Sequence, residues 1–220
     1  MNQGRWEEAE QLEVQVMETR KTKLGVDHPD TLMSISNLAS TYMNQGRWEE
    51  AEQLNVQVME TRKTKLGVDH PDTLISMSNL ASTYMNQGRW EEAEQLEVQV
   101  METSKTKLGV DHPDTLTSMA NLAFTLRSSG QRTAALSLMA ECVLLRDRKL
   151  GRNHPHTISV KSTLHEWREK GEAPFFELSE APIDPKDEQI LTSLTETSRP
   201  VSKLNQQGRR RIFSRLLSRK

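Results

Sequence analysis

The apolar residues of this chain recur at helical spacing in two alternating kinds of segment, separated by short polar stretches that contain glycine. The first kind is clearest after His70-Pro71-Asp72-Thr73. There the apolar residues fall along one side of a helix, at Leu74, Met77, Leu80, Ala81 and Tyr84. The second kind spans about residues 89–108, with an inner side made of Trp90, Ala93, Leu96, Val100 and Met101. Each segment predicts one amphipathic helix, and the two are named helix A and helix B.

The ends of both helices carry residues that typically start and stop helices. Pro71 suits a first helical turn, and the acidic Asp72 suits the positive N-terminal end of helix A. Gly88 separates helix A from helix B, and Gly109 predicts the C-terminal cap of helix B. The Gly-Val-Asp loop that follows is short, so helix B and the next helix A should pack antiparallel.

This helix pair is repeated along the chain. Glycines at positions 4, 46, 88 and 130 set a period of 42 residues, and the sequence MNQGRWEEAEQL occurs three times. A fixed period of this size predicts a solenoid, in which each unit buries its apolar face against its neighbours. The first two copies differ at three positions only: Glu13/Asn55, Met33/Ile75 and Ile35/Met77. Copies so alike indicate recent duplication, and we expect the function to reside in the stacked surface.

The two ends of the array differ from its middle. Residues 1–24 are predicted to form a helix B that has no helix A before it in this sequence, so its apolar side would lack one neighbour. Three alternatives remain: a covering partner, self-association through this helix, or membership of a longer array, which we favour. In the last unit, 127–168, the final helix carries Lys161, His165 and Arg168 where earlier units have apolar residues, as capping repeats do.

These observations predict an all-α chain with two parts. Residues 1–170 would form the array, made of one helix B, three full A/B pairs and a capping helix. Residues 171–220 contain several prolines, Ser/Thr and mixed charges, which predict a tail of low order.

Charge narrows the class of ligand. The chain has a net charge of −2 and a mean hydropathy of −0.69. Residues 1–126 hold 11 Lys/Arg against 20 Asp/Glu, whereas residues 127–168 hold 8 against 3 and residues 169–220 hold 10 against 8. An acidic array argues against nucleic acid as the ligand of the repeats, because the phosphate backbone binds basic surfaces.

The chain carries no motif for catalysis. It has no GxxxxGK[ST] loop, no cluster with metal-ligand spacing, and no evident His-Asp partners for its single cysteine, Cys142. We therefore predict a protein that is not an enzyme and needs no cofactor. One cysteine excludes an internal disulfide framework and favours a reducing compartment, so we expect a cytoplasmic location.

The repeat resembles a known family. Leu38-Ala39, Tyr42, Gly46 and Ala51 stand at the offsets of Leu, small, Tyr, Gly and Ala in the tetratricopeptide consensus. The 42-residue period and the string NLASTYMNQGRWEEAEQL…KLGVDHPDT are similar to the repeats of kinesin light chains, which also occur in the sensor arrays of fungal NOD-like receptors. The resemblance covers about residues 1–168 and implies a right-handed superhelical solenoid of antiparallel helix pairs.

The sequence departs from this family in two respects. It contains neither the heptad region of kinesin light chains nor the nucleotide-binding motif of the receptors. In addition, Glu13, Asn55 and Glu97 stand where the consensus often has a large apolar residue, which Met139 restores.

In this family the A helices line the concave surface, so the resemblance implies that ligand contacts come from them. Positions 33, 37, 40 and 44 share one face of helix A, distinct from the buried stripe. Position 36 is one of seven positions that vary among the three similar copies, five of which lie on helix A. We predict that a peptide or partner protein binds in this groove through Met33, Ser36, Asn37, Ser40, Asn44, Ile75, Ser78, Asn79, Ser82, Asn86, Thr117, Ala120, Asn121, Phe124 and Arg127.

Three of these residues form a ladder of amides. Asn37, Asn79 and Asn121 occupy the same position in successive copies, and each offers a donor and an acceptor to the backbone of an extended peptide. The family uses such asparagines in this way. The alternative is that each amide bonds within its own repeat. Arg127, at one end of the groove, would favour an acidic group of the ligand.

Two further residue types recur with the repeat. His28, His70, His112 and His154 each precede proline, and this regularity predicts loop or cap residues rather than metal ligands, which would have to converge. Trp6, Trp48 and Trp90 are predicted to pack between adjacent helix pairs.

The C-terminal end supports a second hypothesis. The segment QGRRRIFSRLLSRK carries six basic and no acidic side chains, at Arg209, Arg210, Arg211, Arg215, Arg219 and Lys220. Under this hypothesis the array is a spacer or self-association surface, and the basic tail binds an anionic membrane surface or nucleic acid. The alternative for the tail is a solvated end without a ligand. Deleting residues 205–220 separates the two hypotheses.

Overall fold

The computed structural model describes residues 3–169, and within them every regular element is an α-helix, which confirms the predicted all-α class. The helices are α1 (Gln3–Leu24), α2 (Pro29–Asn44), α3 (Trp48–Leu66), α4 (Pro71–Asn86), α5 (Trp90–Leu108), α6 (Pro113–Ser128), α7 (Arg132–Leu150) and α8 (Pro155–Glu169). The limits predicted for helices A and B of the second copy agree with α4 and α5 to within one or two residues. The predicted limit at residue 170 and the basic tail lie outside the described residues.

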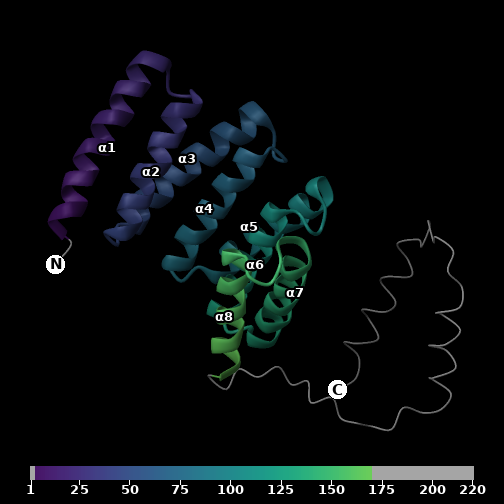
Figure 1. The fold of residues 1–220 in the computed structure, drawn as a ribbon. Helices are drawn as coiled ribbons and strands as arrows, with labels where there is room; N and C mark the ends of the chain where they lie inside the picture. Colours follow the sequence, from purple (N-terminus) through teal and green to yellow (C-terminus); the bar gives the residue numbers. More distant parts are fainter. Residues whose placement is uncertain (1–2, 170–220) are drawn as a thin grey trace, which may run out of the picture. The chain divides into compact units, whose positions relative to one another are not determined.

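Each helix packs against the next one along the chain, and α4 also contacts α6 (Figure 1). The even-numbered helices α2, α4, α6 and α8 are therefore the A helices, and the odd-numbered ones are the B helices. This sequential packing gives a solenoid in which the core is divided among the repeats.

Histidine and glycine set the helix ends, as predicted. Nδ1 of His70 accepts a hydrogen bond from the backbone N–H of Asp72 at 3.2 Å and caps α4, and the same bond recurs at α2, α6 and α8. Gly67 caps the C-terminal end of α3, and its φ of 94° and ψ of 160° are accessible almost only to glycine. The loop then turns back, and Thr73 Oγ1 of α4 donates to Gly67 O at 2.8 Å.

The buried stripe of helix A is confirmed for Leu74, Met77, Leu80 and Ala81. The tryptophans are less buried than predicted, because Trp48 and Trp90 remain 37% and 36% exposed. They stand at the first residue of a B helix, where the Trp90 ring lies over the turn before α5, close to Gly88. Ala51 and Ala93, about one turn later, are fully buried.

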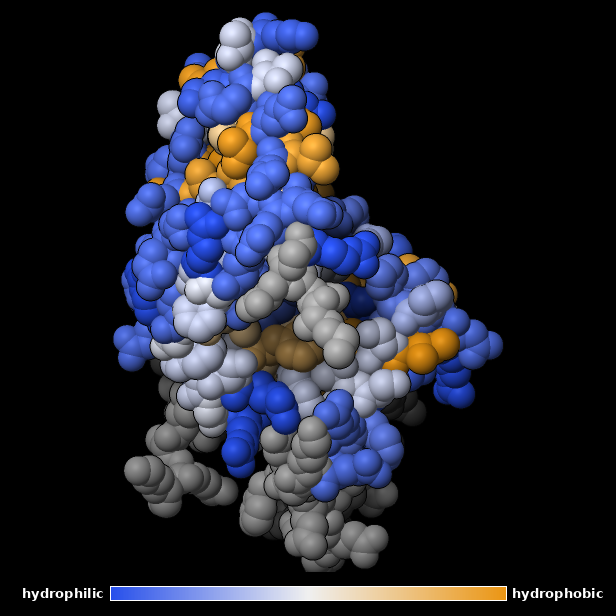
Figure 2. Space-filling model, turned by 90° about the vertical axis from the view of Figure 1, so that its left-hand side faces the viewer, coloured by the Kyte–Doolittle hydropathy of each residue, from blue (hydrophilic) through white to orange (hydrophobic). Residues whose placement is uncertain are grey.

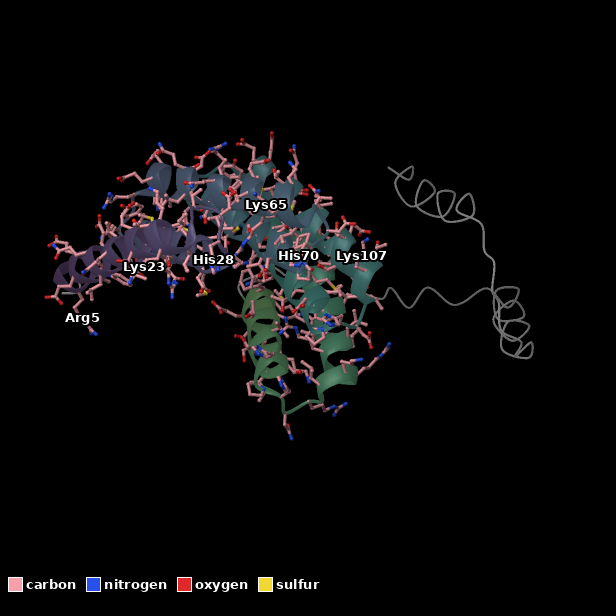
Figure 3. The ribbon with its side chains drawn as sticks, turned by 90° about the horizontal axis from the view of Figure 1, so that it is seen from above. Arg5, Lys23, His28, Lys65, His70 and Lys107 are labelled. Carbon is pink, nitrogen blue, oxygen red and sulfur yellow. The ribbon has the colours of Figure 1, made fainter. Side chains whose placement is uncertain are left out.

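Ion pairs connect each repeat to the next. Lys65 pairs with Asp27 at 3.0 Å and Lys107 pairs with Asp69 at 2.8 Å, and Figure 3 shows the labelled lysines following one another along the array. On the B helices, Arg89 pairs with Glu52 at 2.8 Å. Such partly exposed pairs contribute at most about 1 kcal/mol each.

The two ends of the array present different surfaces. Leu12 and Val16 of α1 are 64% and 45% exposed, and Figure 2 shows hydrophobic surface on the upper part of the molecule, which includes α1. At the other end α8 buries Val160, Leu164 and Trp167 on its inner side. Its outer side carries exposed His165 and Arg168, as predicted for a cap, whereas the half-buried Lys161 pairs with Asp147 of α7. Within residues 3–169, no helix is long and apolar enough to cross a membrane.

Candidate functional site

The predicted groove residues lie on three A helices, α2, α4 and α6, and several of them expose apolar surface. Met33, Ile75 and Phe124 are 46%, 56% and 41% exposed. They alternate with exposed or half-buried polar residues on the same face. This face, defined by positions 33, 37, 40 and 44 and their counterparts, is called the groove face below.

A pocket of about 250 Å³ opens on the groove face between α4 and α6, with α5 beneath it. Five predicted groove residues line it: Ile75, Ser78, Asn79, Thr117 and Asn121. The remaining lining residues are Pro71, Leu74, Val100, Ser104, Leu108, Asp114 and Ser118. The pocket therefore combines an apolar floor with a rim of hydroxyl, amide and carboxylate groups.

The amides of the asparagine ladder have no protein partner in the described part of the chain. Asn79 and Asn121 bond within their repeat only through the backbone, where their carbonyls accept from Thr83 and Thr125. Their side chains are half-buried beside the pocket, and Asn37 is exposed. Asn86 differs, because its Nδ2 donates to Ser82 O at 2.8 Å.

One predicted position lies deeper than expected. This is position 36, which is Ser36 in the first copy and Ala120 in the third. Ala120 is only 7% exposed and belongs to the core. The hydroxyl oxygen of Ser36 is buried. Position 36 follows the buried position 35 directly, so its side chain points toward helix B at the floor of the groove. Ser78 shows this direction, because its Oγ donates to Glu97 Oε2 of α5 at 3.3 Å.

Two of the three polar residues noted on helix B, Asn55 and Glu97, are buried at this floor, and Glu13 is half-buried. Glu97 is 1% exposed, and burial raises the pKa of its carboxyl to about 7, opposed in part by the Ser78 hydrogen bond. Asn55, its counterpart on α3, is 3% exposed and donates to Thr83 Oγ1 at 3.0 Å. Met139 fills the same position on α7, and it is fully buried. The floor of the groove thus changes from polar to apolar along the array.

Aromatic contacts define the end of the groove face near α8. Phe124 contacts Trp167 edge-on, with ring centroids 5.2 Å apart. The guanidinium of Arg127 lies over the same indole, 4.9 Å from the ring centroid. Arg127 is therefore held by α8, and its role toward an acidic ligand group stays a prediction.

A second, more open hollow of about 330 Å³ lies on the neighbouring part of the same helices. It is lined by Ser82, Met85, Asn86, Trp90 and Ser128. Two of these residues, Ser82 and Asn86, belong to the predicted groove. The partly exposed Trp90 beside them was predicted to pack between helix pairs.

Sequence reasoning missed the residues that helix B contributes to the pocket, namely Val100, Ser104 and Leu108. One signal was available: position 104 is serine where the first two copies carry Arg20 and Arg62. Its meaning required knowing which helices meet around it. In residues 3–169 the structure has no group of three or more His, Cys, Asp or Glu side chains arranged to hold a metal ion.

Comparisons with known proteins agree with this architecture. Two matches of one tetratricopeptide repeat model together cover residues 31–148, and a second tetratricopeptide repeat model matches residues 1–30. The comparison with curated proteins gives no match.

Similar solved structures include a protein of Podosopora anserina assigned as a kinesin light chain, with nearly identical TPR-like repeats. It is 27% identical, with a TM-score of 0.64, over 90% of this chain and 92% of that one. Its Q17M form is 28% identical, with a TM-score of 0.65, over 89% and 87%. BtubC (BKLC) from P. vanneervenii, at 17% identity and a TM-score of 0.62 over 93% and 80%, shares the fold. The repeats are of the kinesin light chain-like type, and the chain belongs to the tetratricopeptide repeat family.

Proposed function

We propose that this array is a protein-interaction module that holds an extended peptide segment of a partner on its groove face. The pocket between α4 and α6 carries the proposal, because it joins exposed apolar surface to amides that have no partner in residues 3–169. Tetratricopeptide arrays are protein-interaction scaffolds, and the peptide contact is the finer step proposed for this chain.

In this proposal Asn37, Asn79 and Asn121 pair with the ligand backbone. Successive amides lie one repeat apart, so they would contact an extended segment at intervals. Side-chain preference would come from the residues that differ between copies, chiefly Met33, Ile75 and Phe124. A free, buried Cys142 fits the reducing cytoplasm predicted as the compartment.

The test is a peptide-display selection on the full chain and on a variant with Asn37, Asn79 and Asn121 all changed to alanine. We expect an enriched motif whose affinity falls by about 2 kcal/mol or more in the variant, a plausible sum of lost hydrogen bonds. Asn153→Ala makes the same change at an exposed position in the turn between α7 and α8, outside the groove face, and should bind as the wild type does. A triple variant that folds and binds equally well would refute the assignment.

One observation favours the alternative of self-association. Leu12 and Val16 of α1 expose most or nearly half of their apolar side chains among residues 3–169. Sedimentation of the full chain and of Leu12→Ser/Val16→Ser tests this surface. Under the spacer hypothesis the double variant loses self-association, and deletion of residues 205–220 abolishes membrane or nucleic-acid binding. Under the peptide-binding proposal both variants keep the selected peptide.

A further inference from the structure

In two copies of the repeat, an arginine of helix B occupies the space beneath the first turns of the next helix A. Arg62 Nη1 donates to Asp72 O at 3.1 Å and to Ser76 Oγ at 3.0 Å. Arg20 makes the same pair of bonds in the first copy, at 3.0 and 2.7 Å. The repeat thus has a built-in guanidinium site, made of a backbone carbonyl and a serine hydroxyl.

The fourth copy fills the equivalent space in its own way. Arg146 is 6% exposed and donates to His156 O at 3.4 Å and to Leu116 O at 3.0 Å. The third copy alone carries a short residue at this position, Ser104, which is 3% exposed.

The pocket on the groove face lies at this substitution. Ser104, Asp114 and Ser118 all line it, and the last two are the counterparts of Asp72 and Ser76. Its volume of about 250 Å³ is several times the roughly 30 Å³ that one water occupies. The pocket therefore lies where the other three copies hold an arginine side chain, and it opens on the groove face.

The acceptors of the guanidinium site make different hydrogen bonds in the third copy than in the first two. In the first two copies the serine hydroxyl donates to the carbonyl four residues before it. In the third copy Ser118 Oγ donates instead to Thr115 O at 2.9 Å. Asp114 O consequently receives neither the serine nor the arginine bond that its counterparts receive within residues 3–169.

We propose that this pocket binds an arginine side chain of the peptide ligand, which supplies the guanidinium that the third copy lacks. The guanidinium would donate to Asp114 O and Ser118 Oγ, in the geometry that Arg62 shows one repeat earlier. The inference rests on the proposed peptide-binding function and names the ligand chemistry of that site.

The lining of the pocket matches this side chain in three respects. Leu74, Val100 and Leu108 offer apolar surface to the methylene stem. The planar fork of N–H donors suits two acceptors at fixed positions, which a lysine ammonium satisfies less well. The exposed Asp114 carboxylate and the excess of acidic residues in 1–126 favour a cation over a carboxylate ligand.

The probe is a synthetic array of short peptides with random flanks and one fixed central residue: arginine, lysine, citrulline or glutamine. Citrulline keeps the shape of arginine but removes its charge, so it separates fit from electrostatics. The full wild-type chain should bind the arginine set about tenfold or more tightly than the citrulline and glutamine sets, as charge-assisted hydrogen bonds predict.

Two variants act as reciprocal controls. Ser104→Arg restores the residue of the sister copies, so it should fold, keep groove binding and lose the preference for arginine. Arg62→Ser opens the equivalent site in the second copy and should add a second preferred arginine position. Circular dichroism and the unfolding midpoint check that both variants are folded.

The outcomes separate the two levels of the proposal. If wild type and Ser104→Arg bind the same peptides with the same preference, the arginine pocket is refuted while groove binding stands. If the wild type binds no peptide on any array, the proposed function itself fails, and the arginine pocket with it.

Discussion

The buried carboxyl of Glu97 makes a quantitative prediction about stability and pH. Burial raises its folded-state pKa to about 7 from the ordinary value of 4.5. The protonated form is therefore favoured in the folded chain, and its stabilisation is complete below the unfolded pKa. Stability falls as pH rises from 4.5 toward 7, because the unfolded state releases this proton first.

The size of the effect follows from the shift. At 1.36 kcal/mol per pKa unit, a shift from 4.5 to about 7 corresponds to a penalty of about 3 kcal/mol at high pH. About 2.5 kcal/mol of this should be lost between pH 5 and pH 8. The carboxyls whose pKa values arginine or lysine lowers, such as Glu10 and Asp111, lose their stabilising charge below this window.

The perturbation is Glu97→Asn, because the second copy already carries asparagine at this position. Asn55 is equally buried there and bonds Thr83 Oγ1, so the substituted side chain would meet Thr125 in the same way. Urea unfolding at about pH 5 and pH 8 measures the free energy of unfolding of both chains. We expect the loss between the two pH values to be smaller in the variant by about 2.5 kcal/mol.

A control substitution, Glu91→Gln, makes the same change of charge at an exposed site of the same helix. It should leave the pH dependence as in the wild type. Equal losses of stability in wild type and Glu97→Asn would refute the reasoning, since histidines and other shared groups cancel in the difference.

Three further predictions concern the packing of the repeats. Gly67→Ala should lower the free energy of unfolding by about 1–3 kcal/mol, because φ at this position is +94°. Steric overlap is not the cause, since nothing lies within 4 Å of the added Cβ. Urea unfolding measures the change, and unchanged stability would contradict this reasoning. Arg89→Gln copies the fourth copy's Gln131 and should lower the free energy of unfolding by at most about 1 kcal/mol, since the partner Glu52 is partly exposed. A loss that is the same at high salt would exclude an ion-pair origin. Trp167→Ala should lower the free energy of unfolding by about 3–5 kcal/mol, because the indole is buried. Hydrogen exchange should show that the loss of amide protection is concentrated in α8 and its neighbours. A uniform loss of protection would argue against local packing.

Much of the fold follows from the sequence because its determinants are local. The step pattern from Leu74 to Tyr84 defines one helix face, and a histidine followed by proline defines where each helix A begins. The groove face was predictable for the same reason, since residues three and four apart share a face whatever packs against the helix. Position 36 shows the limit of this reasoning. Its counterpart in the second copy, Ser78, bonds to Glu97 of the neighbouring B helix. The spacing along helix A could not show whether this side chain points to that helix or to the ligand.

By itself, the sequence determined the helix pairs, their period and the face on which the asparagines stand, because caps and apolar spacing act within one or two turns. Only the tertiary structure decided what lies between the helices. The raised pKa of Glu97 depends on burial between successive A helices, and the pocket at Ser104 depends on acceptors in the first turns of α6. From the sequence alone, Ser104 in place of an arginine reads as a change on the surface of one helix. The packing of the helices shows that it changes the shape and the hydrogen bonding of the groove.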